Sequence, residues 1–204
     1  MFNVRLGTRF HTIKNRNMMT TKKLICLLVF CGALNLIHGQ YTIEPAEGYT
    51  PQIGIMVDML EDLKDRITEQ VKDLDQEQTD FLFDEDANSI GALIMHLISN
   101  ESYYQVETLE GRNWNPEEAE FFMAAGGLGP EAREKHRGKP IKYYLDLWDA
   151  IRAKTLAGLK TKDDAWFAAE VDEGVNNHWV WFHVMEHSAN HRGQIALVKN
   201  RLPE

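Results

Sequence analysis

The chain has 204 residues, of which 44% are hydrophobic and 26% charged, and its formal net charge is −9 at pH 7. This profile is typical of an ordinary globular protein with room for one core. An acidic surface repels phosphate backbones, so we expect no nucleic-acid partner.

The N-terminal region has the pattern of an export signal. Lys22 and Lys23 precede an apolar run from Leu24 to Ile37, and a small residue, Gly39, follows it. A basic segment, a short apolar segment and a small residue predict a secretory signal peptide. The run is short for a helix that spans a bilayer, although an uncleaved anchor is the alternative.

We therefore expect residues 1–39 to be an N-terminal extension and signal peptide, and residues 40–204 to be one exported domain. Met1, Met18 and Met19 are the candidate start positions. Cleavage would leave 16 basic and 31 acidic residues, a net charge of −15, and no stable membrane anchor. It would also remove Cys26 and Cys31, so any thiol chemistry would need a thiol from the substrate.

The first half of the domain predicts two long helices. Apolar residues recur at helical spacing from Pro51 to Leu74, and the acidic stretch from Asp73 to Asp86 predicts a connection. Asn88 or Ser89 is expected to cap the second helix, whose apolar face includes Ile90 to Ile98.

The middle of the chain predicts one more long helix between broken segments. Residues 111–139 are glycine-rich, with a short helix expected at Pro116 to Ala125 and a loop at Gly126 to Pro130. The third helix is expected from Ile141 to about Leu159, and the acidic stretch from Thr161 to Gly174 predicts another connection. No alternating β pattern is present.

The last helix carries most of the chemistry. Asn176 or Asn177 should cap it, and His183, His187 and His191 follow one another in steps of four, which places them on one face. Two such imidazoles can hold one divalent metal, but His183 and His191 are separated by about 12 Å of helix rise. A third ligand must therefore come from elsewhere in an all-α fold, a four-helix bundle with long connections between helices 2–3 and 3–4.

Other interpretations of these residues stand beside this metal site. The histidines could form a hydrogen-bonded polar stripe, and His96 on the second helix could be a packed core residue. His183 to His187 also matches H-x-x-E-H, the inverted zinc-protease pattern, but the chain ends at Glu204 before a downstream carboxylate ligand could follow. Gly193, in mid-helix, is expected to permit close approach of another helix.

His96, followed after a long gap by Glu186-His187-Ser188-Ala189-Asn190-His191-Arg192-Gly193-Gln194-Ile195, resembles the DinB-like family. The resemblance extends over roughly residues 51–202. It implies a four-helix bundle that binds a divalent metal through His96, His187 and His191. His178 and His183 would then line or support the site.

The activities known in the family that this chain resembles are those of metal-dependent thiol transferases and isomerases, which use a low-molecular-weight thiol. The resemblance therefore implies a metal-dependent transferase or hydrolase in which the ion activates a thiol or a water. Glu101, Glu186, His183 and Tyr104 are the candidate general bases, while Asn190, Gln194 and Glu101 are candidates to orient the ligand rings. We expect zinc first, with nickel or iron as the other candidates.

The competing hypothesis is a non-catalytic bundle that binds metal or a protein partner. A small-molecule substrate, in particular a small thiol, is the partner that the enzyme hypothesis requires. Trp179, Trp181 and Phe182 would form a sticky patch if they were exposed, and a homodimer is the assembly that such a patch would support.

Overall fold

The computed structural model describes residues 42–203, and within them the chain is mostly helical. The predicted signal peptide and its start positions lie outside the described residues. The all-α class is confirmed, with one small hairpin added. The elements are α2 (Pro51–Val71), α3 (Gln76–Asp80), α4 (Ile90–Tyr104), a π-helical turn η1 (Gln105–Leu109), α5 (Pro116–Gly127), α6 (Gly129–Lys135), α7 (Ile141–Leu159), α8 (Asp164–Ala168), β1 (Glu170–Asp172), β2 (Val175–Asn176) and α9 (Asn177–Lys199).

The long helices begin where the sequence places their caps. The Ser89 hydroxyl accepts a hydrogen bond from the Ala92 amide (3.2 Å), and the Asn176 side chain accepts one from the Trp179 amide (2.8 Å). Each cap satisfies an amide that the first helical turn leaves without a partner. The predicted bounds of α7 are exact, and α2 ends three residues before the predicted end.

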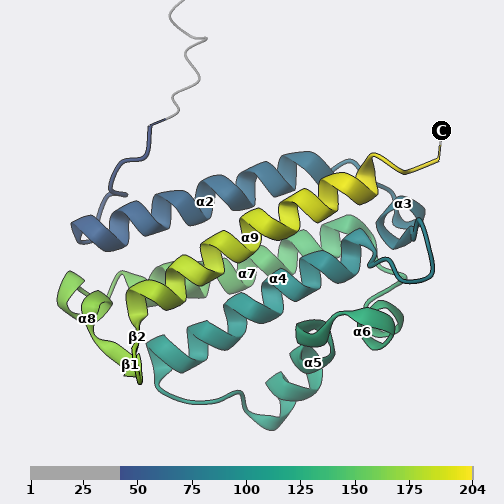
Figure 1. Cartoon of the computed structure of the whole chain (residues 1–204). Coiled ribbons are helices and arrows are strands. Elements are labelled where there is room, and N and C mark those ends of the chain that lie inside the picture. The colour runs from purple at the N-terminus through teal and green to yellow at the C-terminus, as the bar shows by residue number, and fades with distance from the viewer. Residues whose placement is uncertain (1–41, 204) are drawn as a thin grey trace, which may run out of the picture. The chain divides into compact units, whose positions relative to one another are not determined.

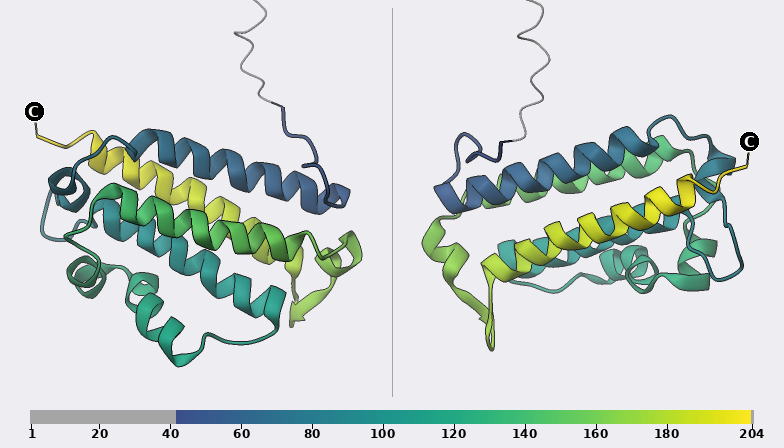
Figure 2. Two further views of the ribbon diagram at one scale, coloured as in Figure 1. Left: turned by 180° about the vertical axis from the view of Figure 1, so that it is seen from behind. Right: turned by 45° about the horizontal axis from the view of Figure 1, so that its top comes forward.

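Four long helices, α2, α4, α7 and α9, lie side by side in the described part of the chain (Figures 1 and 2). α4 packs against both α7 and α9, and α2 packs against the same two helices. α4 is the most deeply buried of them, since most of its side chains lie in the core. Its central place explains why its sequence is apolar on nearly every face.

The core falls into two clusters along the helices. One surrounds α4 and α7 and contains Tyr144 and Trp148, and the other joins α2 to the start of α9 and contains Phe167 and Trp181. Trp181 is fully buried, so the expected exposed patch lacks it, whereas Trp179 and Phe182 are exposed. No helix among residues 42–203 is long and apolar enough to cross a membrane.

Three of the expected connections contain short elements. Asp75 and Gln78 form a reciprocal capping box that begins α3, and Asp163 caps α8. Gly129 and Pro130, expected in a loop, begin α6, since proline suits the first turn of a helix. In the two acidic connections, local side-chain caps thus outweigh the composition, whereas α6 begins without a side-chain cap and has proline in its first turn.

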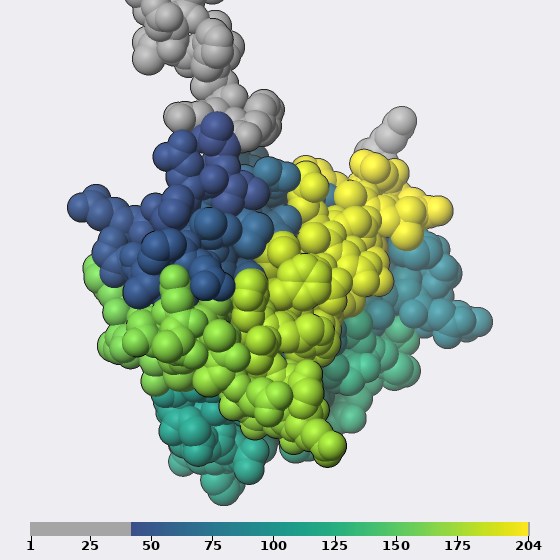
Figure 3. All heavy atoms as spheres, turned by 60° about the vertical axis from the view of Figure 1, so that its left-hand side comes forward, coloured from purple at the N-terminus to yellow at the C-terminus, as the bar shows by residue number. Residues whose placement is uncertain are grey.

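The hairpin of β1 and β2 was not predicted. The two strands pair antiparallel, and Gly174 in the turn has a positive φ of 74°. Strands of three and two residues are too short to show an alternating pattern. At this end of the molecule α8 packs against both α2 and α9, and the hairpin follows α8 and leads into the start of α9 (Figure 3).

A buried ion pair joins α4 to α7. Two nitrogens of Arg152 donate to the Glu101 carboxylate (2.7 and 2.9 Å), and the Trp148 indole donates to it as well (2.9 Å). Burial by itself would raise the pKa of Glu101, but the Arg152 charge and these hydrogen bonds outweigh it and hold that pKa below its usual range. Glu101 is therefore a charged residue of the core.

Replacing Arg152 should destabilise the fold strongly. Arg152→Met leaves the Glu101 carboxylate buried without a counter-charge, which typically costs about 3–5 kcal/mol of unfolding free energy. Urea denaturation measures the change, and Glu101→Gln in the same chain should restore much of the loss. Lys142→Ala, which breaks the exposed Lys142–Asp146 pair on the same helix, should change little. Equal losses from Arg152→Met and Lys142→Ala would contradict this account.

Candidate metal centre

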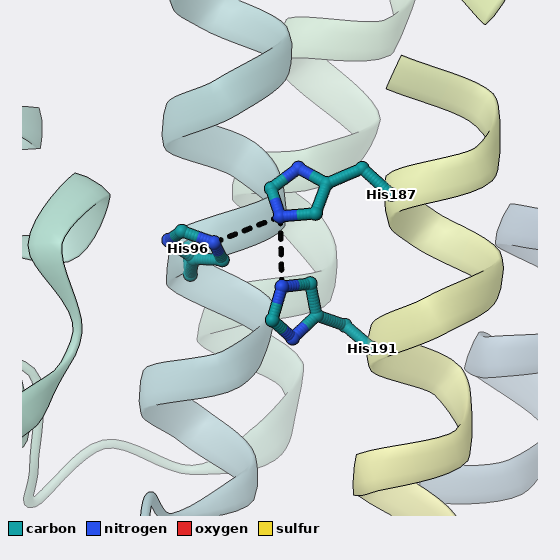
Figure 4. A group of neighbouring side chains, drawn as sticks. All are labelled: His96, His187 and His191. Atoms are coloured by element: carbon teal, nitrogen blue, oxygen red, sulfur yellow. Dashed lines mark hydrogen bonds between the residues drawn. The ribbon is translucent and has the colours of Figure 1, made fainter. Parts of the chain in front are cut away.

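Three imidazoles meet between α4 and α9 (Figure 4). His96 comes from α4, and His187 and His191 come from successive turns of α9. The Nε2 atom of His187 lies 2.9 Å from Nε2 of His96 and 2.7 Å from Nε2 of His191. The structure therefore brings together the three residues that the resemblance selects, with three nitrogens facing one point.

The outer nitrogens of two rings have acceptors. His96 Nδ1 lies 2.9 Å from the Ala125 carbonyl oxygen, and His191 Nδ1 lies 3.0 Å from Oε1 of Gln194. An oxygen of this kind only accepts, so each Nδ1 must carry the hydrogen and donate it. A neutral imidazole carries one hydrogen, so the Nε2 atoms of His96 and His191 present lone pairs to the centre.

His187 cannot satisfy both of its neighbours within the protein. Its Nε2 contacts two nitrogens that both carry lone pairs, and it has at most one hydrogen to donate in its neutral form. At least one of the two close contacts then joins two lone pairs. A divalent cation at the point where the three Nε2 atoms meet would accept all three lone pairs. The three imidazoles therefore fit a divalent metal ion of the kind that histidine nitrogens bind.

Burial keeps the three rings neutral. It lowers the pKa of His96 and His191, and for His187 it combines with the neighbouring histidines to lower the pKa to about 3. Neutral imidazole is the form that binds metal ions. His96 and His187 are only partly buried, so the centre is not sealed from solvent.

His183 stands one turn before His187, beside the triad. Its Nδ1 lies 3.0 Å from Oε1 of Glu186. Its ring stacks on the rings of Trp179 and His187, with centroids 5.3 Å away in both cases, and Tyr104 meets it edge-on. These contacts fix the plane of the ring while leaving Nε2 without a protein partner among the described residues.

The remaining candidates take different places. Both oxygens of the Glu101 carboxylate accept hydrogen bonds, from Arg152 and from Trp148. Glu101 therefore neither orients a histidine of the triad nor is available as a general base. Asn190 is exposed and makes no side-chain hydrogen bond among the described residues. His178 stacks on Phe167 (4.5 Å).

This geometry bears on one alternative and one expectation from the sequence. The H-x-x-E-H pair does not form a shared centre, because His187 joins His96 and His191 while His183 pairs with Glu186. The expected close approach at Gly193 is wrong, since a Cβ there would meet no atom within 4 Å. Gly193 lies on an exposed part of α9.

Comparison with known proteins identifies the family. The family described as mycothiol-S-transferase matches residues 55–203, which include all three histidines of the triad. The chain belongs to the mycothiol S-transferase family. This family is DinB-like, so the resemblance stated from the sequence is confirmed.

A solved structure shares the fold of this family member. It is the crystal structure of a conserved protein from Enterococcus faecalis, with a TM-score of 0.58 and 16% sequence identity over 72% of this chain and 94% of that one. At this identity the similarity concerns the fold alone. A comparison with curated proteins finds no match.

Sequence reasoning missed one partner of the site, the Ala125 carbonyl. A backbone acceptor has no residue-type signal, and α5 reaches His96 only because it packs across α4. Gln194 was predicted as a ring-orienting residue, and its position three residues after His191 on one helix is the signal that identifies it.

The metal-free protein should lose stability as the pH falls. The pKa of His187 is about 3 in the folded chain, against about 6.5 for an ordinary histidine, so the unfolded chain binds more protons below about pH 6.5. The unfolding free energy should therefore decrease from about pH 6.5 downwards to about pH 3, as measured by urea denaturation in chelator. His187→Asn should make this dependence less steep, with His96 and His191, whose pKa values are also lowered, retaining part of it, and Asn190→Ala on the same helix should leave it unchanged. A wild-type slope in His187→Asn would contradict the assignment.

Proposed function

We propose that this protein is a metal-dependent thiol S-transferase whose centre is a divalent ion held by His96, His187 and His191. The observation that carries the proposal is the convergence of three Nε2 atoms whose lone pairs the protein alone cannot satisfy. Membership of the mycothiol S-transferase family supports a small thiol as the substrate. Zinc is the first candidate, followed by nickel or iron.

A bound divalent ion supplies the positive charge that lowers the pKa of a thiol or a water and makes it a nucleophile. The chain supplies the fixed ligand face. The Ala125 carbonyl holds the ring of His96, and Gln194 holds the ring of His191, so both rings keep the tautomer in which Nε2 faces the centre.

The proton of the thiol needs an acceptor near the centre. Within the triad, each Nε2 faces the centre, two Nδ1 atoms donate to oxygens, and Nδ1 of His187 is buried. His183 is the neighbouring imidazole, and its Nε2 has no hydrogen-bond partner within the part of the chain that the structure describes. We propose that Nε2 of His183 takes the proton while Glu186 accepts from Nδ1 and fixes the ring.

The site lies in a domain that we propose spans residues 40–204. The lateral packing of α2, α4, α7 and α9 supports a four-helix bundle. We further propose that residues 1–39 are an N-terminal extension with a signal peptide that exports the protein. The exposed Trp179 and Phe182 support a homodimer as the proposed assembly.

Hydrolysis is the second candidate reaction, favoured by the predicted export signal. Small reducing thiols are mostly cytosolic, whereas water is available to an exported enzyme. The same ligand face and the same proton acceptor would serve a water nucleophile. The alternative of a non-catalytic metal-binding protein requires a loaded site that accelerates neither reaction.

Metal content tests the centre directly. We expect about one divalent ion per chain in the purified full-length protein, by elemental analysis, and its loss in His96→Ala, His187→Ala and His191→Ala, because two imidazoles hold the ion far less tightly than three. His183→Ala should retain the ion. Retention in His96→Ala together with loss in His183→Ala would instead place the ion at the H-x-x-E-H pair.

Turnover tests the role of His183. We expect His183→Ala to lower kcat/KM about 10²- to 10⁴-fold, since a general base contributes on that order, with the metal retained. The assay is S-transfer from mycothiol to monochlorobimane, followed by fluorescence, and added imidazole should restore part of the rate. Phe182→Ala, at a neighbouring exposed position, is the matched control. An unchanged rate in His183→Ala would remove it from the mechanism, and a metal-loaded wild type without activity on thiol or ester substrates would favour the non-catalytic alternative.

A further inference from the structure

An apolar pocket lies beside the triad, further along the same two helices. Its volume is about 230 Å³, and it is lined by Phe83, Asn88, Leu93, Gln194, Leu197 and Val198. Leu93 stands three residues before His96 on α4, and Gln194 stands three residues after His191 on α9. Because the two helices run antiparallel here, both residues lie about one turn from the centre on the same side.

The antiparallel direction follows from the ring contacts. His96 meets His187 and His191, whereas Tyr104, two turns later on α4, meets His183, which is earlier on α9. The pocket and the His183–Trp179 stack therefore lie at opposite sides of the triad. In Figure 4 the second nitrogen of His191 points away from the other two rings, and Gln194 is its partner.

Hydrogen bonds that their oxygens accept fix the orientation of the two amide side chains of the pocket. Oδ1 of Asn88 accepts from the Gly129 amide (3.0 Å), and Oε1 of Gln194 accepts from His191 (3.0 Å). Their NH₂ groups have no acceptor among the described residues. With both oxygens occupied, the pocket offers apolar walls and hydrogen-bond donors.

We propose that this pocket is a binding site for a small apolar molecule that carries a hydrogen-bond acceptor oxygen, such as a carbonyl. Four apolar side chains would cover its body, and the NH₂ groups of Asn88 and Gln194 would donate to its oxygen. Its place beside the centre makes it the site of the second substrate, an assignment that rests on the proposed transferase function. Binding of such a molecule to the pocket requires no reaction.

Gln194 links this pocket to the triad. One amide both accepts from His191 and lines the pocket, so a ligand that polarises its NH₂ group strengthens the acceptor at Oε1. Ligand binding in the pocket should therefore change the strength of the hydrogen bond from His191 Nδ1 to Gln194.

The test uses cyclohexanone, an apolar ring with one acceptor oxygen, titrated into the purified full chain while methyl NMR signals are followed. We expect saturable shifts at Leu93, Leu197 and Val198 and a shift of the His191 ring signals. Cyclohexylamine, whose cation offers donors instead of an acceptor, should bind at least about threefold more weakly, although the acidic chain attracts cations. Equal binding of the two probes would overturn the assignment of an acceptor oxygen.

Three variants locate the binding. Leu197→Trp, at a half-exposed rim position, should fill the pocket and abolish the shifts at Val198. Asn88→Asp keeps an oxygen for the Gly129 amide but removes the donor, and should weaken cyclohexanone binding about threefold to tenfold. Ile55→Trp, at an exposed position on α2, should leave binding unchanged. Wild-type affinity in Leu197→Trp would overturn the site.

Metal content in the same samples separates this inference from the proposed function. If the ion is bound and cyclohexanone shifts none of the pocket methyls, the pocket proposal fails and the metal centre stands. If cyclohexanone binds at Leu197 and Val198 but no sample holds an ion after reloading, the binding site stands and the proposed transferase fails.

Discussion

The packing of α4 against α9 is the contact on which the rest of the site depends. α4 is buried along most of its length between α7 and α9, so its side chains have little freedom to change register. His96 stands on the part of α4 that faces the two histidine turns of α9. A ligand set drawn from two rigid helices is preorganised, because neither helix can shift without disturbing the core.

The distribution of hydrogens over the imidazoles decides what the site can do. Two rings donate outward to oxygens and direct their lone pairs inward, and the third ring cannot satisfy both of them. Hydrogen bonds within the protein therefore cannot satisfy all three Nε2 atoms at once, whereas a bound cation would accept a lone pair from each of them. Among residues 42–203, His183 is the neighbouring ring whose Nε2 has no hydrogen-bond partner, because Glu186 is the partner of its Nδ1.

The buried carboxylate of Glu101 on α4 belongs to the structure of the core and not to the histidine triad. Glu101 lies five residues after His96, yet its carboxylate forms the ion pair with Arg152 that joins α4 to α7. The ion pair with Arg152 keeps that charge away from the triad, so the candidate centre is lined by three neutral imidazoles. A neutral ligand set leaves the full charge of a divalent ion available to a bound thiol or water.

The sequence by itself determined the features that arise within a few residues of each other. Helix bounds followed from apolar spacing and from caps such as Ser89 and Asn176, and the i, i+4 step placed His187 and His191 on one face. The choice of His96 as the third member came from the family resemblance, since a single histidine on an apolar helix has no spacing that marks it. Short elements such as α6 and the hairpin were missed because their signals extend over too few residues.

Only the tertiary structure decided which distant groups meet. The Ala125 carbonyl lies 29 residues from His96, and Arg152 lies 51 residues from Glu101. The pocket beside Gln194 likewise needs side chains from both α4 and α9. Contacts within one helical turn are fixed by local geometry, whereas contacts between helices depend on how their apolar faces pack, and residue spacing along the chain does not encode that choice.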